Sequence, residues 1–172
     1  MTDLYIFRHG DTERTENSNI LSVLFRRDGG GLSDLPILPK GIPALEKIGA
    51  YLKNIPTDAN FTSPYLRCKE SSKIVGSISN RIYKVDEGIR EFEEEKRNFA
   101  GFKNRITDFL DRIDKKNYSA VSICTHGAVI AAIKHLITSG KFSFFQVWDF
   151  PAPGNLIIIK DGKVESVDFN SK

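Results

Sequence analysis

The stretch of residues 4–12 reads LYIFRHGDT. Its first four residues are apolar, and a short continuous apolar run is typical of a strand that is buried on both faces of a parallel sheet. Polar side chains begin directly after this run, with Arg8 and His9. Ligands of open α/β sheets bind beyond the carboxyl ends of the strands. We therefore expect this stretch to deliver an arginine and a histidine to a functional site.

Alternating strand and helix patterns follow along the chain. Strands are expected at residues 4–7, 59–62, 120–124 and 156–159, with a weaker one at 81–85. Helical spacing of apolar residues is found at 42–52, 65–78, 99–113 and 128–137. Such alternation predicts an α/β fold, a three-layer α/β/α sandwich with a mainly parallel sheet. The length of 172 residues predicts a single domain over residues 1–172. At the C-terminus, Asp161-Gly162 predicts the turn of a hairpin over residues 155–169.

The composition indicates a soluble globular protein and argues against several classes of partner. Hydrophobic residues make up 40% of the chain, charged residues 27%, and the net charge is +3. No basic stripe is present, so nucleic acid is not an expected partner. No apolar run approaches the roughly 20 residues of a membrane span, and no signal peptide precedes the first strand, so a cytoplasmic location is expected. Two cysteines, Cys68 and Cys124, are expected to be reduced and partly buried.

Three predicted strands are followed by residues suited to phosphate. Arg8 and His9 follow the first, Arg67 lies one turn into the helix after the second, and His126-Gly127 follows the strand at 120–124. Ser63-Pro64 is expected to cap the helix that carries Arg67. Two arginines can hold a phosphate dianion through forked hydrogen bonds. The helix start at Gly127 adds backbone N–H groups.

Two imidazoles at such a site have complementary uses. A neutral imidazole is a nucleophile toward phosphorus, and neighbouring arginines lower its pKa and so keep it neutral. A second imidazole, if protonated, can donate to the phosphoryl oxygens and stabilise the transition state. The third histidine, His135, is out of phase with the start of its helix and is expected to be structural. A zinc site is not expected, because Arg8 and Arg67 would repel a cation.

Four segments resemble the motifs of a known family. Residues 7–12 resemble the Arg-His-Gly signature of the histidine phosphatase superfamily, also called the phosphoglycerate mutase-like family. Residues 34–41 resemble its Asp-x-Pro-Leu-Thr-x-x-Gly segment, residues 62–68 its Ser-Pro-Leu-x-Arg segment, and residues 125–128 its second His-Gly motif. The motifs occur in the family's order and extend from residue 4 to about residue 140.

The resemblance implies a role for each matching residue. His9 is implied to be the nucleophile that becomes phosphorylated, Arg8 and Arg67 bind the phosphate, and His126 contacts it. The general acid is implied to be Glu91, in the segment Gly88-Ile89-Arg90-Glu91, with Glu93 as the alternative.

The chain departs from the family pattern in two places near the site. Thr15 replaces an asparagine that often follows the first histidine, so its phosphate contact is in question, and Leu38 replaces a threonine. The segment from His9 to Asp34 also looks longer than usual, and the irregular stretch from Asp11 to about Leu38 is expected to form one wall of the site or a lid. Its Arg26-Arg27 pair is read as a solvated loop and its three consecutive glycines, residues 29–31, as a hinge or linker.

The expected function is a metal-independent phosphatase without a cofactor. Its substrate would be a phosphomonoester of a small molecule, or a phosphoprotein that carries phosphohistidine.

A phosphoglycerate mutase is the first alternative to this function. However, only residues 92–119 separate Glu91 from the next strand, and mutases of the family are typically longer there. A non-catalytic phosphate-binding domain is the second. The oligomeric state is not predicted, because the apolar stretch at residues 142–150 is compatible with an interface or with core. Its aromatic residues are expected to form core or edge packing rather than a stacking platform: Phe144, Phe145, Trp148 and Phe150.

Overall fold

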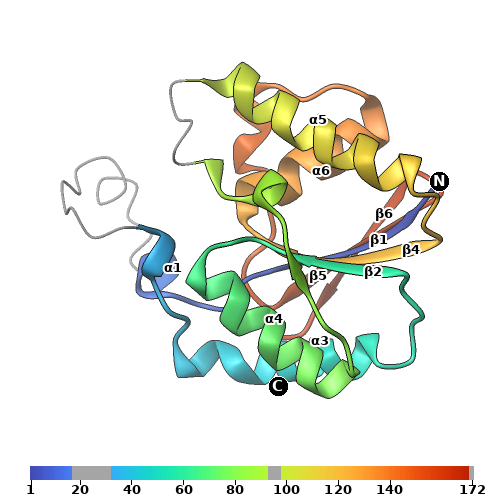
Figure 1. The fold of residues 1–172 in the computed structure, drawn as a ribbon. Helices are drawn as coiled ribbons and strands as arrows, with labels where there is room; N and C mark the ends of the chain where they lie inside the picture. The colour runs from blue at the N-terminus through green and yellow to red at the C-terminus, as the bar shows by residue number, and fades with distance from the viewer. Residues whose placement is uncertain (17–31, 93–97, 171–172) are drawn as a thin grey trace.

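The computed structural model describes residues 1–16, 32–92 and 98–170 of the chain, and it contains one six-stranded sheet (Figure 1). The strands are β1 (Asp3–Arg8), β2 (Ala59–Thr62), β3 (Lys84–Val85), β4 (Ala120–Thr125), β5 (Asn155–Lys160) and β6 (Lys163–Asp168). The described α-helices are α1 (Glu13–Glu16), α3 (Ile42–Leu52), α4 (Leu66–Ser79), α5 (Phe99–Lys115) and α6 (Gly127–Ser139). Short 3-10 helices are η1 (Leu32–Asp34), η2 (Pro39–Gly41), η3 (Glu87–Ile89) and η5 (Phe144–Trp148).

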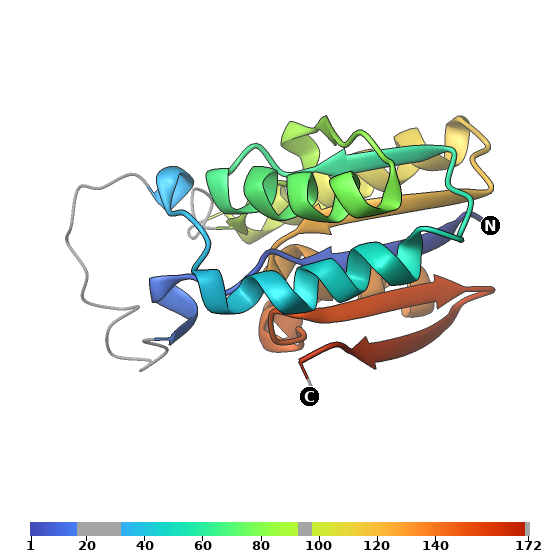
Figure 2. The ribbon, with the colours of Figure 1, turned by 90° about the horizontal axis from the view of Figure 1, so that it is seen from below.

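The sheet is mixed but mainly parallel, as predicted. Its strand order is β3-β2-β4-β1-β5-β6, and the pairs β1–β4, β2–β4 and β2–β3 are parallel. The last two strands run antiparallel and form the predicted hairpin, whose turn residues Asp161 and Gly162 have φ values of 49° and 72°. Helices α3 and α4 cover one face of the sheet, while α5 and α6 cover the other (Figures 1 and 2). The predicted three-layer α/β/α sandwich is therefore confirmed.

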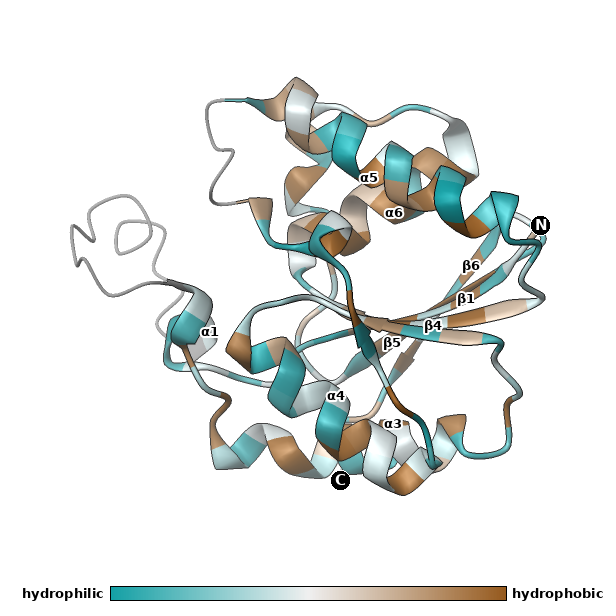
Figure 3. Ribbon diagram, in the orientation of Figure 1, coloured by the Kyte–Doolittle hydropathy of each residue, from teal (hydrophilic) through white to brown (hydrophobic). Residues whose placement is uncertain are grey.

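Burial explains why these sequences form these elements. All six residues of β4 are buried, because this strand lies in the middle of the sheet with helices on both sides. Helix α5 buries Phe102, Ile106, Phe109 and Ile113, which are spaced by three or four residues and so share one face. In Figure 3 the ribbon of α5 alternates between hydrophilic and hydrophobic residues, whereas α6 is mostly hydrophobic and is buried along most of its length.

Two predicted boundaries are wrong for local reasons. The weak strand expected at 81–85 is only Lys84–Val85, because the backbone N–H of Arg81 bonds to the carbonyl of Gly76 and so closes α4. Ser63 does not cap α4, which begins at Leu66 after Tyr65. The Ser63 side chain instead turns toward β4, where it meets His126.

The aromatic segment before β5 lies at the edge of the core, one of the two arrangements expected for it. Phe145 and Trp148 are 88% and 66% exposed, and Phe144 is 47% exposed. The rings of Phe144 and Trp148 contact those of Phe99 and Phe150, respectively. The three exposed aromatic residues lie on η5, whose three residues per turn place Phe145 and Trp148 on one outward side while Val147 is buried.

Part of the long segment after β1 is more regular than expected, since it contains α1 and η1. The predictions for Arg26, Arg27 and residues 29–31 lie outside the described residues. Within the described ranges, no helix is long and apolar enough to span a membrane.

The contact between α3 and α4 depends on Gly49 and generates a stability prediction. A Cβ at this position would lie 2.9 Å from Ile78 Cβ and 3.1 Å from the Val75 carbonyl oxygen, so Gly49→Ala forces the helices apart. We expect the free energy of unfolding to fall by about 1–2 kcal/mol, although alanine by itself favours a helix. Urea unfolding measures this. Ala50→Ser, on the exposed side of the same helix, is the control and should cost about 0.5 kcal/mol or less. Unchanged stability of Gly49→Ala would show that the helices are not in close contact here.

Candidate active site

The carboxyl ends of β1 and β4 bring two predicted site residues together. Arg8 pairs with Thr125 in the parallel register, so the next residue of each chain segment, His9 and His126, lies at the same edge. The two imidazole rings are 5.3 Å apart, centroid to centroid, at an angle of 61°. The start of α4, which carries Arg67, lies at this same end of the sheet, opposite the N-terminus (Figures 1 and 2).

His9 is held in one tautomer by its own backbone segment. Its Nδ1 lies 2.8 Å from the carbonyl oxygen of Gly10. A carbonyl oxygen can only accept, so Nδ1 carries the ring proton and Nε2 keeps a lone pair. Burial lowers the pKa of His9 well below 6.5, and the charges of Arg67 and Arg8 lower it further. His9 is therefore a neutral imidazole with an available nucleophilic nitrogen.

A serine connects the His9 segment to the helix of Arg67. The backbone N–H of Gly10 donates to Ser71 Oγ at 2.9 Å, and this hydroxyl donates to the carbonyl of Arg67 at 2.6 Å. Ser71 is completely buried. Because Ser71 follows Arg67 by one helical turn, the hydrogen bonds fix the first turn of α4 relative to the end of β1.

The two predicted arginines lie against aromatic rings, with Arg67 buried and Arg8 partly buried. The guanidinium of Arg8 lies 4.8 Å from the ring centroid of Phe150 and donates to the carbonyl of Pro151 at 3.1 Å. That of Arg67 lies 4.8 Å from the ring of Tyr65. Arg8 Nε is buried and has no hydrogen-bond partner among the described residues. A buried donor without a partner is costly, so this site is suited to an anion that would accept its hydrogen bond.

His126 directly follows β4 and is fully buried against residues at and just before the start of α4. Its Nε2 lies 2.6 Å from Ser63 Oγ and 3.5 Å from Cys68 Sγ, and its ring meets that of Tyr65 edge-on at 5.1 Å. Burial lowers the pKa of His126 well below 6.5, and Arg67 adds to this effect. The free protein therefore favours a neutral His126, not the protonated second imidazole considered from the sequence.

Glu91 faces His126 across the site, with Oε2 3.6 Å from Nδ1. Its backbone segment is fixed by Arg105 of α5, which donates to the carbonyls of Gly88 and Arg90 at 2.8 and 2.9 Å. Thr125, at the end of β4, donates to the carbonyl of Ile89 at 2.7 Å. The structure thus brings Glu91 to the predicted edge, while Glu93 lies outside the described residues.

The remaining predicted residues have mainly backbone roles. Thr15 Oγ1 accepts from the N–H of Thr12 at 2.8 Å and donates to its carbonyl at 2.9 Å, so the hydroxyl closes a turn and its phosphate contact stays a prediction. Gly127 starts α6, and a Cβ there would lie 2.7 Å from the ring of Phe150. Over the described ranges, no three histidine, cysteine or carboxylate side chains are placed to share a metal ion.

Sequence reasoning missed three contributors to the site. Ser63 was read as a helix cap, and Ser71 received no role. Arg14 of α1 was not considered, although its charge lowers the pKa values of His9 and Arg8 and it interacts electrostatically with Glu91. The spacing of Ser71 one turn after Arg67 was an available signal, whereas nothing in the sequence showed that α1 turns Arg14 toward the site.

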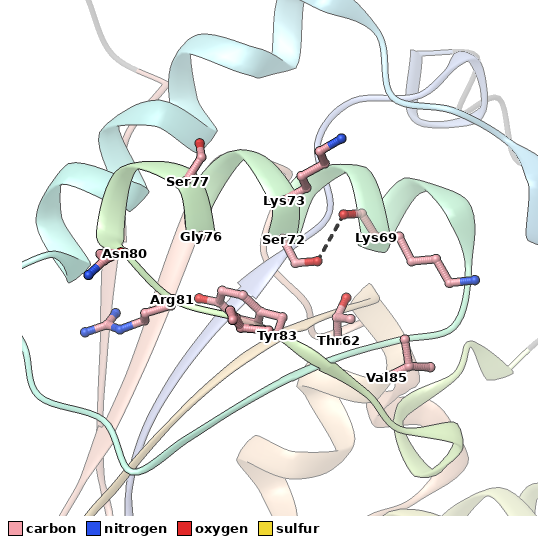
Figure 4. Close-up of a pocket in the computed structure, with 11 residues that line it drawn as sticks. Thr62, Lys69, Ser72, Lys73, Gly76, Ser77, Asn80, Arg81, Tyr83 and Val85 are labelled. Atoms are coloured by element: carbon pink, nitrogen blue, oxygen red, sulfur yellow. Dashed lines mark hydrogen bonds between the residues drawn. The ribbon is translucent and has the colours of Figure 1, made fainter.

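A groove of about 530 Å³ lies on another part of the molecule, between α4 and the edge strand β3 (Figure 4). Lys69, Lys73 and Tyr83 are among the side chains that line it. It contains none of the seven residues predicted to carry the chemistry or bind phosphate, which are His9, Arg8, Arg67, Glu91, His126, Thr15 and Gly127. The strand ends, not this groove, are therefore the candidate active site.

Comparison with solved structures shows the same fold in phosphatases and mutases. A putative alpha-ribazole-5'-P phosphatase from Escherichia coli has 17% identity and a TM-score of 0.72, with 99% of this chain and 98% of that chain covered. The protein histidine phosphatase SixA, solved with tungstate, has 14% identity and a TM-score of 0.66, with 96% and 94% covered. Phosphoglycerate mutase from Bacillus anthracis has 21% identity and a TM-score of 0.66, with 98% and 93% covered. At these identities the likeness concerns the fold alone.

The sequence itself supplies the family assignment. No curated protein sequence matches the chain significantly. The profile of the histidine phosphatase superfamily (branch 1) matches residues 4–96, which include the Arg8-His9 motif, the Arg67 motif and Glu91. The match covers more than half of the chain and confirms the resemblance drawn from the motifs: the chain belongs to the histidine phosphatase superfamily.

Proposed function

We propose that the protein is a phosphatase that hydrolyses a phosphomonoester or a protein phosphohistidine through a phosphohistidine intermediate on His9. The observation that carries this proposal is the hydrogen bond between His9 Nδ1 and the Gly10 carbonyl, beside the buried Arg67 and the partly buried Arg8. It leaves Nε2 unprotonated next to the cations that would hold a phosphate. Neither step of this chemistry requires a metal ion.

The proposed reaction has two steps. His9 Nε2 attacks phosphorus and forms the N–P bond, while the bond to the leaving oxygen breaks and Glu91 donates its proton to that oxygen. Arg8 and Arg67 hold the phosphoryl oxygens. In the second step Glu91, now a carboxylate, takes a proton from water as the water attacks phosphorus. The N–P bond breaks, inorganic phosphate leaves, and both residues return to their starting states.

The segment after Glu91 supports hydrolysis over the mutase alternative. Helix α5 occupies most of the chain between Glu91 and β4, and it packs on the sheet through its buried face. The described part of this segment therefore supplies no additional cover that would keep water from a phosphohistidine. Two of the proteins with the same fold are described as a putative alpha-ribazole-5'-P phosphatase and as a protein histidine phosphatase, and either class of substrate fits the present proposal.

Replacement of His9 tests the nucleophile. His9→Ala should lower kcat for p-nitrophenyl phosphate by at least about 1000-fold, because the covalent step is lost. Wild-type activity in excess EDTA should equal that without EDTA. The wild type, quenched during turnover, should show the mass of one added phosphoryl group.

The matched control is the third histidine. His135 lies on α6 and interacts with Asp149 at 2.7 Å, so His135→Ala should keep activity within about twofold. Activity that survives in His9→Ala, or that EDTA abolishes, would refute the proposed mechanism. Absence of hydrolysis in the wild type together with transfer between phosphoglycerates would establish the mutase instead.

The environment of His9 generates a pH prediction. Its pKa is lowered by burial and by Arg67, so His9 stays neutral as the pH falls through 6.5 and protonates only at lower pH. In Arg67→Gln one repelling charge is removed, and the pKa of His9 should rise. An NMR titration of the three histidines, assigned by single replacements, measures both midpoints. A wild-type midpoint at or above 6.5, or no upward shift in Arg67→Gln, would contradict this account.

Glu91 and Glu93 are distinguished by the leaving group. Glu91→Gln should lower kcat/KM for a substrate with a poor leaving group, such as glycerol phosphate, by about 100-fold. It should affect p-nitrophenyl phosphate less than about tenfold, since nitrophenolate leaves without a proton. Glu93→Gln is the control and should be close to wild type with both substrates. If Glu93→Gln shows the leaving-group dependence instead, the acid is Glu93.

A further inference from the structure

The hydroxyl of Ser63 is buried against the imidazole of His126. The distance from Ser63 Oγ to His126 Nε2 is 2.6 Å, and both side chains are completely buried. Cys68 Sγ lies near both ring nitrogens, 3.5 Å from Nε2 and 3.8 Å from Nδ1, but a thiol is a weaker hydrogen-bonding group than a hydroxyl. Ser63 is therefore the principal partner of this nitrogen.

The direction of the hydrogen bond follows from the partners of the hydroxyl. In the part of the chain that the structure describes, Ser63 Oγ has two recorded partners, His126 Nε2 and the backbone N–H of Tyr65 at 3.4 Å. The Tyr65 N–H can only donate, so Oγ accepts there. The hydroxyl proton then has Nε2 as its acceptor, because a buried hydroxyl is seldom left without one. This direction requires that Nε2 be unprotonated.

The other ring nitrogen then carries the proton. In neutral imidazole one nitrogen donates and the other accepts, so Nδ1 of His126 is the donor. Nδ1 faces Glu91 Oε2 at 3.6 Å, which is longer than a normal hydrogen bond. The Nδ1–H group therefore points toward Glu91 but makes no short hydrogen bond to its carboxylate. It can donate to an oxygen of a bound phosphoryl group instead.

We propose that Ser63 is a positioning residue that fixes His126 in the Nδ1–H tautomer, so that a neutral ring donates a hydrogen bond to the phosphoryl group. His9 and His126 then have the same tautomer, but each presents a different ring nitrogen to the phosphoryl group. His9 has its Nδ1–H tied to Gly10 and presents Nε2 as nucleophile, whereas His126 has Nε2 tied to Ser63 and presents Nδ1–H as donor. The contribution to catalysis rests on the proposed phosphatase function, but the tautomer does not.

Nitrogen-15 NMR of the free protein tests the tautomer directly. The chain has only three histidines, so replacement of His9 and of His135 one at a time assigns the signals of His126. We expect Nδ1 of His126 to be protonated at neutral pH in the wild type, and a mixture of tautomers in Ser63→Ala. A protonated Nε2 in the wild type, or an unchanged tautomer in Ser63→Ala, would overturn the proposal. The wild-type spectrum decides even if Ser63→Ala does not fold or no substrate is known.

Kinetics test whether the tautomer matters for the reaction. Ser63→Ala should lower kcat for p-nitrophenyl phosphate about 10- to 100-fold, as is usual for a residue that orients a reacting group. KM should change less than about threefold, since Arg8 and Arg67 are intact. Ser63→Thr keeps the hydroxyl and should recover most of the loss. Wild-type kcat in Ser63→Ala, or a loss confined to KM, would refute the catalytic part alone.

Ser72, on the helix α4 that follows Ser63, offers a matched control. It is also buried, but its hydroxyl donates to the Lys69 carbonyl at 3.1 Å and borders the groove on the far side of α4 (Figure 4). Ser72→Ala should lose a comparable hydrogen bond while keeping kcat within about twofold and leaving the His126 tautomer unchanged. Equal loss of kcat in Ser72→Ala and Ser63→Ala would indicate a general effect on stability and count against the proposal.

Discussion

The parallel pairing of β1 with β4 is the constraint on which the site depends. The register that places Arg8 opposite Thr125 also places His9 beside His126, and a slip of one residue would turn one of the two side chains to the opposite face. The register is fixed because β4 is buried along its whole length and lies between helices on both faces. The same packing that forms the core therefore sets the distance between the two imidazoles.

Burial at this edge creates an electrostatic arrangement that no single residue would give. Two imidazoles and two guanidinium groups lie close together, and burial together with the arginine charges keeps both histidines neutral. The guanidinium groups also lie against aromatic rings, Phe150 for Arg8 and Tyr65 for Arg67. In the proposed reaction the same arginines hold the phosphate and lower the pKa of His9, so binding and nucleophilicity depend on the same groups.

The sequence was sufficient for most strands and helices, because these follow from apolar periodicity, and for expecting that His9 and His126 lie at the same edge of the sheet, because both follow strands. The catalytic roles of these residues stay a prediction. The sequence was insufficient where a side chain has two possible partners. Ser63 has the pattern of a helix cap, but its partner His126 is distant in sequence and comes close only through the pairing of β2 with β4. Likewise, the apolar character of Phe145 and Trp148 left core and edge packing both open, because the side on which they lie is set by the 3-10 geometry of η5.

The two edges of the sheet affect how the protein behaves at high concentration. A long, flat, uncharged edge invites strands from other molecules and leads to aggregation. Here one edge, β3, is only two residues long, and the other, β6, is exposed and carries Lys163, Glu165 and Asp168. The antiparallel hairpin that ends the chain thus replaces an apolar edge at β5 with a charged one. The tail of the fold, which contributes none of the proposed catalytic side chains, protects the apolar strands that support them from pairing with another chain.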